Sequence, residues 1–174
     1  MHQYQFPITS DRLIYQPLGE KDLNNWKAFF TNNDQLAFVG ITQPESPEIE
    51  AKKWIERQMG RYESTGVGAL GAYRKSDGLL IGSCGLIWRD NAIDDFIYEI
   101  GYSVIPTEWG KGYASEMAQT FKGYFLQHKL GEKVISIITI DNLGSQKVAL
   151  NNGMKKGEEF TFNGARCFQF YYLV

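Results

Sequence analysis

The sequence predicts an α/β fold whose sheet is mixed, antiparallel at first and parallel at one place in the middle. Two observations predict it. Three strand-like segments between residues 68 and 105 are joined by short polar turns, which indicates an antiparallel meander. The third of them then leads through a Gly-rich turn and a helix to a second apolar strand, a unit that should be parallel and right-handed. A length of 174 residues suits one domain, residues 1–174, with a substantial core.

The first third of the chain predicts one strand and two helices. Residues 11–18 alternate between apolar and polar and are typical of a strand. Apolar residues at i, i+3 and i+7 predict a helix from Leu23 to Phe30. After a loop, Ser46 is a good N-cap and Pro47 a good first helical residue, so a second helix should run to about Tyr62.

The meander follows. Its strands are expected over residues 68–74, 79–88 and 96–105. Ser76-Asp77-Gly78 supplies turn chemistry between the first two, and the polar stretch 89–94 connects the last two.

The remaining elements complete the order β-α-α-β-β-β-α-β-α-β-β. A helix with an apolar face should follow the Gly-rich turn and end near Leu130-Gly131, where Gly131 suits the position after the last turn. The β-branched run 134–140 is typical of a strand buried on both faces. The last expected elements are a short helix over 143–152 and a hairpin with strands 159–162 and 167–173 around Asn163-Gly164.

Composition excludes several classes of function. The formal net charge is −2, without the basic excess typical of nucleic-acid binders. Two cysteines, Cys84 and Cys167, and two histidines, without a CxxC motif, argue against a metal site and suggest small core residues. No signal peptide and no apolar run long enough to span a bilayer is found, so we expect a cytoplasmic protein.

The main functional signal is the turn Trp109-Gly110-Lys111-Gly112-Tyr113-Ala114. Glycines without Cβ atoms let a ligand approach the main chain, and the amides of residues 110–115 at the following helix N-terminus favour an anion such as a pyrophosphate. Lys111 adds a cation at the rim. The string is not a P-loop, and Ser115 occupies the third glycine position of a Rossmann fingerprint. A tight turn without a ligand stays open as the alternative.

The six residues of this turn resemble the cofactor signature Q/R-x-x-G-x-G/A of the GCN5-related N-acetyltransferase (GNAT) superfamily, with Trp109 where Gln or Arg is usual. The longer run from Glu99 to Glu116 looks like the branch that contains the ribosomal-protein N-terminal acetyltransferases. Two further stretches are similar to that branch: Thr9 to Leu18 and Asn142-Leu143-Gly144-Ser145 … Asn152-Gly153-Met154. The resemblance therefore covers nearly the whole chain.

The resemblance implies a GNAT-like, mostly antiparallel sheet with helices on both faces and a central parallel strand pair that splays apart. Acetyl-CoA, the acetyl donor, would lie in that gap, with its pantetheine arm along Tyr102, Ser103, Val104 and Ile105. The pyrophosphate would lie on the turn that includes Trp109, Gly110, Lys111, Gly112, Tyr113, Ala114 and Ser115. Asn142 would contact the pantetheine arm, although it is also a plain helix N-cap.

Direct attack by a neutral amine on the thioester calls for a base, and Glu99 is the candidate. Alternation puts Glu99 on the strand face opposite Tyr98 and Ile100. A carboxylate that is partly desolvated by apolar neighbours is a better proton acceptor near pH 7. A structural carboxylate that pairs with Arg89 or Lys133 is the alternative.

The other catalytic groups follow from the same resemblance. A backbone N–H near Val104 would stabilise the oxyanion. Ser145 is the first candidate to protonate the departing thiolate and Tyr113 a weaker one; Ser145 is alternatively a helical serine without a chemical role.

The acceptor is left open between a protein N-terminus, a polyamine, an amino acid and an aminoglycoside, and so is a homodimer. Phe38 and Trp88 are candidates to line the acceptor pocket, and Asp34 and Glu45 could attract a cationic acceptor or be solvated loop residues. Two rival classes remain: a catalytically silent acyl-CoA-binding or regulatory module on the same fold, and a nucleotide-binding protein that uses the same turn.

Overall fold

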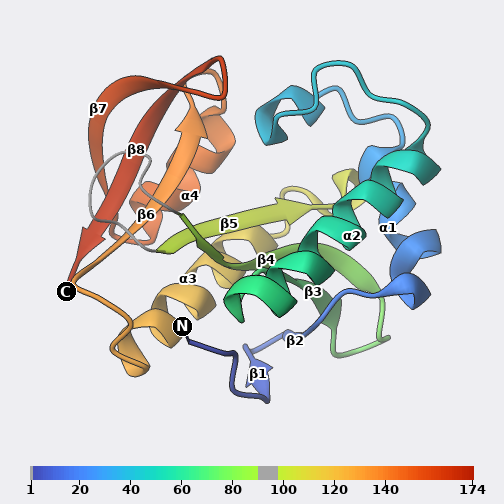
Figure 1. Ribbon diagram of the computed structural model, residues 1–174, viewed down its shortest axis with the longest axis horizontal. Helices are drawn as coiled ribbons and strands as arrows, with labels where there is room; N and C mark the ends of the chain where they lie inside the picture. Colours follow the sequence, from blue (N-terminus) through green and yellow to red (C-terminus); the bar gives the residue numbers. More distant parts are fainter. Residues whose placement is uncertain (1, 90–97) are drawn as a thin grey trace.

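One eight-stranded sheet organises the chain in the computed structural model, which describes residues 2–89 and 98–174 (Figure 1). All neighbouring strands in it are antiparallel except β5 and β6, so the predicted mixed sheet is confirmed. The order along the sheet is β1 (Ile8–Thr9), β2 (Leu13–Gln16), β3 (Ala69–Arg74), β4 (Leu80–Trp88), β5 (Tyr98–Val104), β6 (Lys133–Thr139), β8 (Ala165–Leu173) and β7 (Lys155–Phe162).

Helices cover both faces of this sheet, as predicted. On one face α3 packs against β4 and β5, and on the other α1 and α2 build an aromatic cluster in which the rings of Trp26 and Phe29 stack 4.8 Å apart (Figure 1). The helices are α1 (Leu23–Phe30), α2 (Pro47–Thr65), α3 (Tyr113–Gln127) and α4 (Leu143–Asn151), with short 3₁₀ turns at Glu20–Asp22, Leu36–Val39 and Pro106–Glu108.

Local chemistry sets the helix ends. The Ser46 hydroxyl accepts the amide of Ile49 at the start of α2, and Pro47 is its first residue, as predicted. The prediction for the end of α3 was wrong by about one turn. The helix stops at Gln127, and Lys129, at φ 51°, takes the left-handed position that Gly131 was expected to take.

The closing hairpin turns at Asn163-Gly164, as predicted. Both residues have positive φ, 48° and 81°, which a two-residue hairpin turn of type I′ requires. Strand β7 begins at Lys155 rather than at residue 159. Its first residues are polar and mostly exposed at the sheet edge, so they show no apolar alternation.

The buried cysteines and the boundaries of two strands can also be compared with the predictions. Cys84 and Cys167 are buried and free, as expected of core residues. The strand expected over 11–18 is shorter, β2, and is preceded by the unpredicted β1. The turn expected at 89–94 and the start of the strand expected at 96 fall largely outside the described residues. Within the described ranges, no helix is both long and apolar enough to cross a membrane.

Candidate active site

Strands β5 and β6 separate after a short parallel contact. Their register pairs Glu99 with Ile135, and the Ser136 hydroxyl donates to the carbonyl of Ile100 (2.8 Å). On the other edge of β5, the amide of Ile105 donates to Ile81 of β4. Since backbone groups alternate sides along a strand, the amides of Tyr102 and Val104 face the opening. The splay that the resemblance implied is therefore present, with a bare stretch of strand backbone along it.

The Gly-rich turn closes one end of this opening. Gly110 and Gly112 have φ of 75° and 79°, a region that other residues adopt at a cost. An added Cβ would meet no atom within 4 Å at Gly110, and at Gly112 only the Arg12 guanidinium, at 3.6 Å. Gly112 is the N-cap of α3, and no side chain caps the helix. The amides of the first turn are therefore left for an anion.

Two cations flank the turn, and sequence reasoning identified one of them. Lys111 points back and pairs with Glu108 (2.9 Å), which also pairs with Arg74 (2.9 Å). Arg12 donates to the Lys111 carbonyl (3.0 Å) and lies 4.2 Å from the Tyr113 ring centroid. Arg12 precedes β2 and lies 99 residues before Lys111 in the chain, so only tertiary folding brings its charge to the turn.

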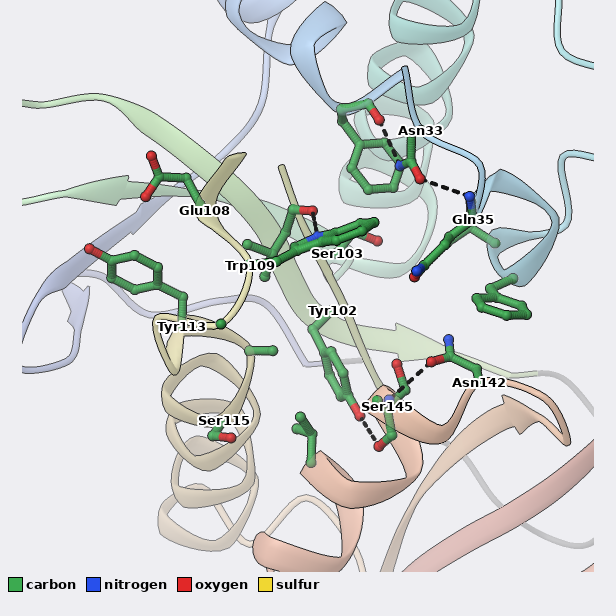
Figure 2. A pocket seen from close by; sticks show the side chains of 18 of the residues that line it. Asn33, Gln35, Tyr102, Ser103, Glu108, Trp109, Tyr113, Ser115, Asn142 and Ser145 are labelled. Carbon is green, nitrogen blue, oxygen red and sulfur yellow. Dashed lines mark hydrogen bonds between the residues drawn. The ribbon is translucent and has the colours of Figure 1, made fainter. Parts of the chain in front are cut away.

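A cleft of about 430 Å³ joins the turn to the splayed strands (Figure 2). Ile105, predicted beside the cofactor, instead packs in the α1–α2 cluster and does not line it, and neither does Lys111. The predicted residues that do line it are Tyr102, Ser103, Val104, Trp109, Gly110, Gly112, Tyr113, Ala114, Ser115, Asn142 and Ser145.

Trp109 occupies one of the backbone groups of β5 that border the cleft. Its indole Nε1 donates to the Val104 carbonyl (2.7 Å), and 40% of the residue is exposed (Figure 2). The carbonyl of Val104 is thereby occupied, whereas its N–H still faces the opening.

At the opposite wall, Tyr102 and α4 meet. The Tyr102 hydroxyl donates to the Ser145 carbonyl (2.9 Å), and burial raises the pKa of this phenol although the Ser145 contact lowers it. The Asn142 carboxamide oxygen accepts the Ser145 amide (3.0 Å), so its N-cap role is present. In Figure 2 the Tyr113 ring points away from Ser145, toward Glu108. The two predicted thiolate donors are therefore not brought together.

A second pocket, of about 260 Å³, continues from the cleft and holds Glu99. The Glu99 carboxylate is 8% exposed and accepts from Arg89 Nε (2.5 Å), the pairing anticipated as the structural alternative. The residues that line both the cleft and this pocket are Phe38, Val39, Tyr102, Ser103, Asn142 and Ser145. The two spaces thus meet where Tyr102 and Ser103 lie on β5.

Aromatic residues were only partly assigned from the sequence. Phe38 lines both spaces, as suggested. Trp88 does not: its ring contacts Tyr98 edge-on (5.3 Å) against the core. Trp88 ends β4, and strand alternation turns it to the α3 face.

Several lining residues carry no sequence signal. Asn33 and Gln35 reach the cleft from the loop after α1 (Figure 2). Arg57 and Arg61 enter the second pocket from α2, where a four-residue spacing puts them on one face. Arginines on an amphipathic helix usually face solvent, so no sequence pattern singles these two out.

Comparison with known proteins agrees with this geometry. The family model described as acetyltransferase (GNAT) domain matches residues 12–155. The uncharacterized N-acetyltransferase YoaA of Bacillus subtilis is 28% identical over 152 residues, 87% of this chain and 84% of its own length.

Two solved structures show the same fold. An acetyltransferase from Agrobacterium tumefaciens has a TM-score of 0.80 at 18% identity, over 100% of this chain and 98% of its own. RimL, a ribosomal L7/L12 α-N-protein acetyltransferase in complex with coenzyme A, has a TM-score of 0.73 at 15% identity, over 97% of each chain. On the strength of the matched domain, the chain belongs to the acetyltransferase (GNAT) family and is an N-acetyltransferase.

Proposed function

We propose that this protein transfers the acetyl group of acetyl-CoA to a primary amine, either a protein N-terminus or a small molecule. The observation that carries this proposal is the continuous space between β5 and β6, which runs from the Gly-rich turn to the pocket of Glu99. Acetyl-CoA, when bound, supplies an acetyl group already activated as a thioester. In this proposal the cleft beside the Gly-rich turn binds the donor and the pocket of Glu99 binds the acceptor. The two spaces meet at Tyr102 and Ser103.

Three features of the cleft fit acetyl-CoA. The uncapped amides that begin α3 and the guanidinium of Arg12 suit a pyrophosphate. The exposed edge of β5 near Tyr102 suits an amide-containing arm that adds to a strand. Asn142 reaches the cleft while it caps α4, so one side chain can serve both roles.

The proposed chemistry assigns a role to each neighbouring group. Glu99 takes the proton of the acceptor amine, directly or through a water. The N–H of Val104, whose carbonyl is held by Trp109, donates to the acetyl oxygen. Ser145 protonates the departing thiolate, and Tyr102, whose hydroxyl already lies against α4, is its nearest alternative. Tyr113 becomes a wall of the turn rather than a proton donor.

The same proposal covers the whole chain. Residues 1–174 form one acetyltransferase domain in it, because β7 and β8 complete the sheet that the matched domain begins. We place the enzyme in the cytoplasm, where acetyl-CoA and amine acceptors are both available.

A catalytically silent acyl-CoA-binding module is the alternative, and one experiment separates the two. Isothermal titration with acetyl-CoA, CoA, NAD and ATP first establishes the ligand. Release of free CoA is then measured with a panel of peptide N-termini, amino acids, polyamines and aminoglycosides. Transfer to any amine above the rate of thioester hydrolysis supports the enzyme, whereas tight acetyl-CoA binding without transfer supports the silent module. Preference for NAD or ATP would refute both.

A further inference from the structure

The pocket of Glu99 is rich in arginine. Arg57 and Arg61 enter from α2, and Arg89 follows β4, whereas Glu99 on β5 is the carboxylate among the lining residues. Among the lining residues that the structure describes, the fully charged groups therefore sum to +2 in a space of about 260 Å³, in a chain whose net charge is −2. A local charge opposite in sign to that of the whole chain calls for a physical reason.

The cations are not all neutralised by their neighbours. Arg89 pairs with Glu99. Arg61 donates to the Gln58 carboxamide (3.2 Å), and the guanidinium of Arg57 lies over the Trp54 ring (5.0 Å). Within the described ranges, neither Arg57 nor Arg61 forms an ion pair.

The arginines are also close enough to repel one another. Desolvation lowers the pKa of Arg61, and the charges of Arg57 and Arg89 lower it further, against the opposing effect of Glu99. Like charges held together in this way destabilise one another. An anion placed between Arg57 and Arg61 would relieve that repulsion and accept hydrogen bonds from planar guanidinium groups, which suit carboxylate and phosphate.

We propose that the acceptor is an anionic amine, with a carboxylate close to the amine that Arg57 and Arg61 bind. This inference rests on the proposed function, since it assigns the second pocket to the acceptor. It selects an amino acid or an acidic peptide N-terminus over a polyamine or an aminoglycoside. The earlier suggestion that Asp34 and Glu45 attract a cationic acceptor finds no support in the lining: neither residue lies in this pocket, and Glu45 pairs with Lys53.

The same charge would assist the reaction. A cationic surrounding disfavours an ammonium ion, so the acceptor amine is held more easily in its neutral, nucleophilic form. A larger share of the bound amine is then neutral before Glu99 accepts a proton. The ion pair between Glu99 and Arg89 is compatible with this smaller contribution from the base.

The test compares acceptors that differ in one charge. The tripeptide amides Ser-Asp-Ala and Ser-Asn-Ala have nearly the same size and the same N-terminal amine, and differ in one negative charge. Free glutamate tests an amino acid in place of a peptide, and phosphoethanolamine tests a phosphate in place of a carboxylate. We expect kcat/KM for the Asp peptide to exceed that for the Asn peptide by about tenfold or more, the scale of one charge-assisted contact. Spermidine should be a poor acceptor.

Variants tie the preference to the arginines. Arg57→Gln and, separately, Arg61→Gln should reduce the Asp-to-Asn ratio at least threefold, with acetyl-CoA Kd unchanged. Lys52→Gln is the matched control, because it removes a positive charge from α2 at an exposed site that pairs with Glu56 outside the pocket. It should keep the ratio.

The outcomes separate this inference from the proposed function. Equal kcat/KM for the two peptides, a preference for spermidine, or an Asp-to-Asn ratio retained in both arginine variants would overturn the anionic acceptor while leaving acetyl transfer intact. A preference for phosphoethanolamine over every acceptor that carries a carboxylate would refute the proposal that the bound group is a carboxylate. Absence of transfer to every amine would remove the proposed function, and this inference with it.

Discussion

Glu99→Gln is the most direct perturbation of the proposed mechanism, because it keeps the size of the side chain and removes its capacity to take a proton. The carboxylate is 8% exposed and lines the second pocket, not the cleft beside the Gly-rich turn. The variant should therefore bind acetyl-CoA with an unchanged Kd and lose activity in the chemical step.

The position of Glu99 on β5 sets the magnitude. Glu99 precedes Ser103, where the two spaces meet, by four residues, or about 13 Å along a strand at roughly 3.3 Å per residue. One carboxylate oxygen is already held by Arg89. Proton transfer through a water fits this separation better than direct contact. General bases contribute about 10²–10⁴-fold, so we expect the lower end, a loss of about 10²-fold or 2.7 kcal/mol in kcat/KM.

The assay is CoA release at saturating acetyl-CoA with two acceptors of different amine basicity. The loss should shrink with the acceptor that is already neutral at assay pH. Glu159→Gln is the matched control, because Glu159 forms an ion pair of the same length with Arg166, on β7 outside both pockets. A folded Glu99→Gln enzyme within about threefold of wild type on both acceptors would refute the reasoning and leave proximity as the mechanism.

Three further outcomes are expected. Gly112→Asp puts a charge where the pyrophosphate should lie and should weaken acetyl-CoA binding at least tenfold in titration, unlike Gly78→Asp, which shares the positive φ outside the cleft. Ser145→Ala should lower kcat more than it raises KM for acetyl-CoA; a wild-type kcat would shift the proton donor to Tyr102. Burial raises the pKa of Glu116, but hydrogen bonds from Ser10 and Arg12 outweigh it and lower that pKa, so the stabilisation should be full above the ordinary pKa of a glutamate and lost as pH falls through the lowered one. Glu116→Gln should flatten the acidic part of the profile of Tm against pH, and an unchanged profile would contradict this reasoning.

The pH prediction for Glu116 also concerns the Gly-rich turn. Its carboxylate holds Arg12 through Nε (2.6 Å) and through the backbone amide (2.8 Å), and Arg12 in turn donates to Lys111. The N-terminal segment is thus tied to the start of α3 by charge-assisted bonds. Protonation of Glu116 should loosen Arg12 at the turn as well as destabilise the fold.

The sequence by itself determined the order of the elements other than the short β1, and the position of the Gly-rich turn, because both depend on local chemistry. Apolar periodicity identifies α1, a continuous β-branched run identifies β6, and Ser46 and Pro47 begin α2. The positive φ of Gly110 and Gly112 favours glycine whatever surrounds it. The parallel pair followed from the strand–helix–strand unit. Where local chemistry was ambiguous, at the end of α3 and the polar edge of β7, the boundaries shifted by a few residues.

Only the tertiary structure decided which side chains share the site. Arg57 and Arg61 of α2 meet Arg89, at the end of β4, in the pocket of Glu99. Arg12, which precedes β2, is brought instead to the Gly-rich turn. The sequence reports charge summed along the chain, which is slightly negative, whereas a ligand meets charge summed over a pocket. That difference is why a slightly acidic composition is compatible with a cationic acceptor, whereas the charge of the folded pocket is the basis for proposing an anionic one.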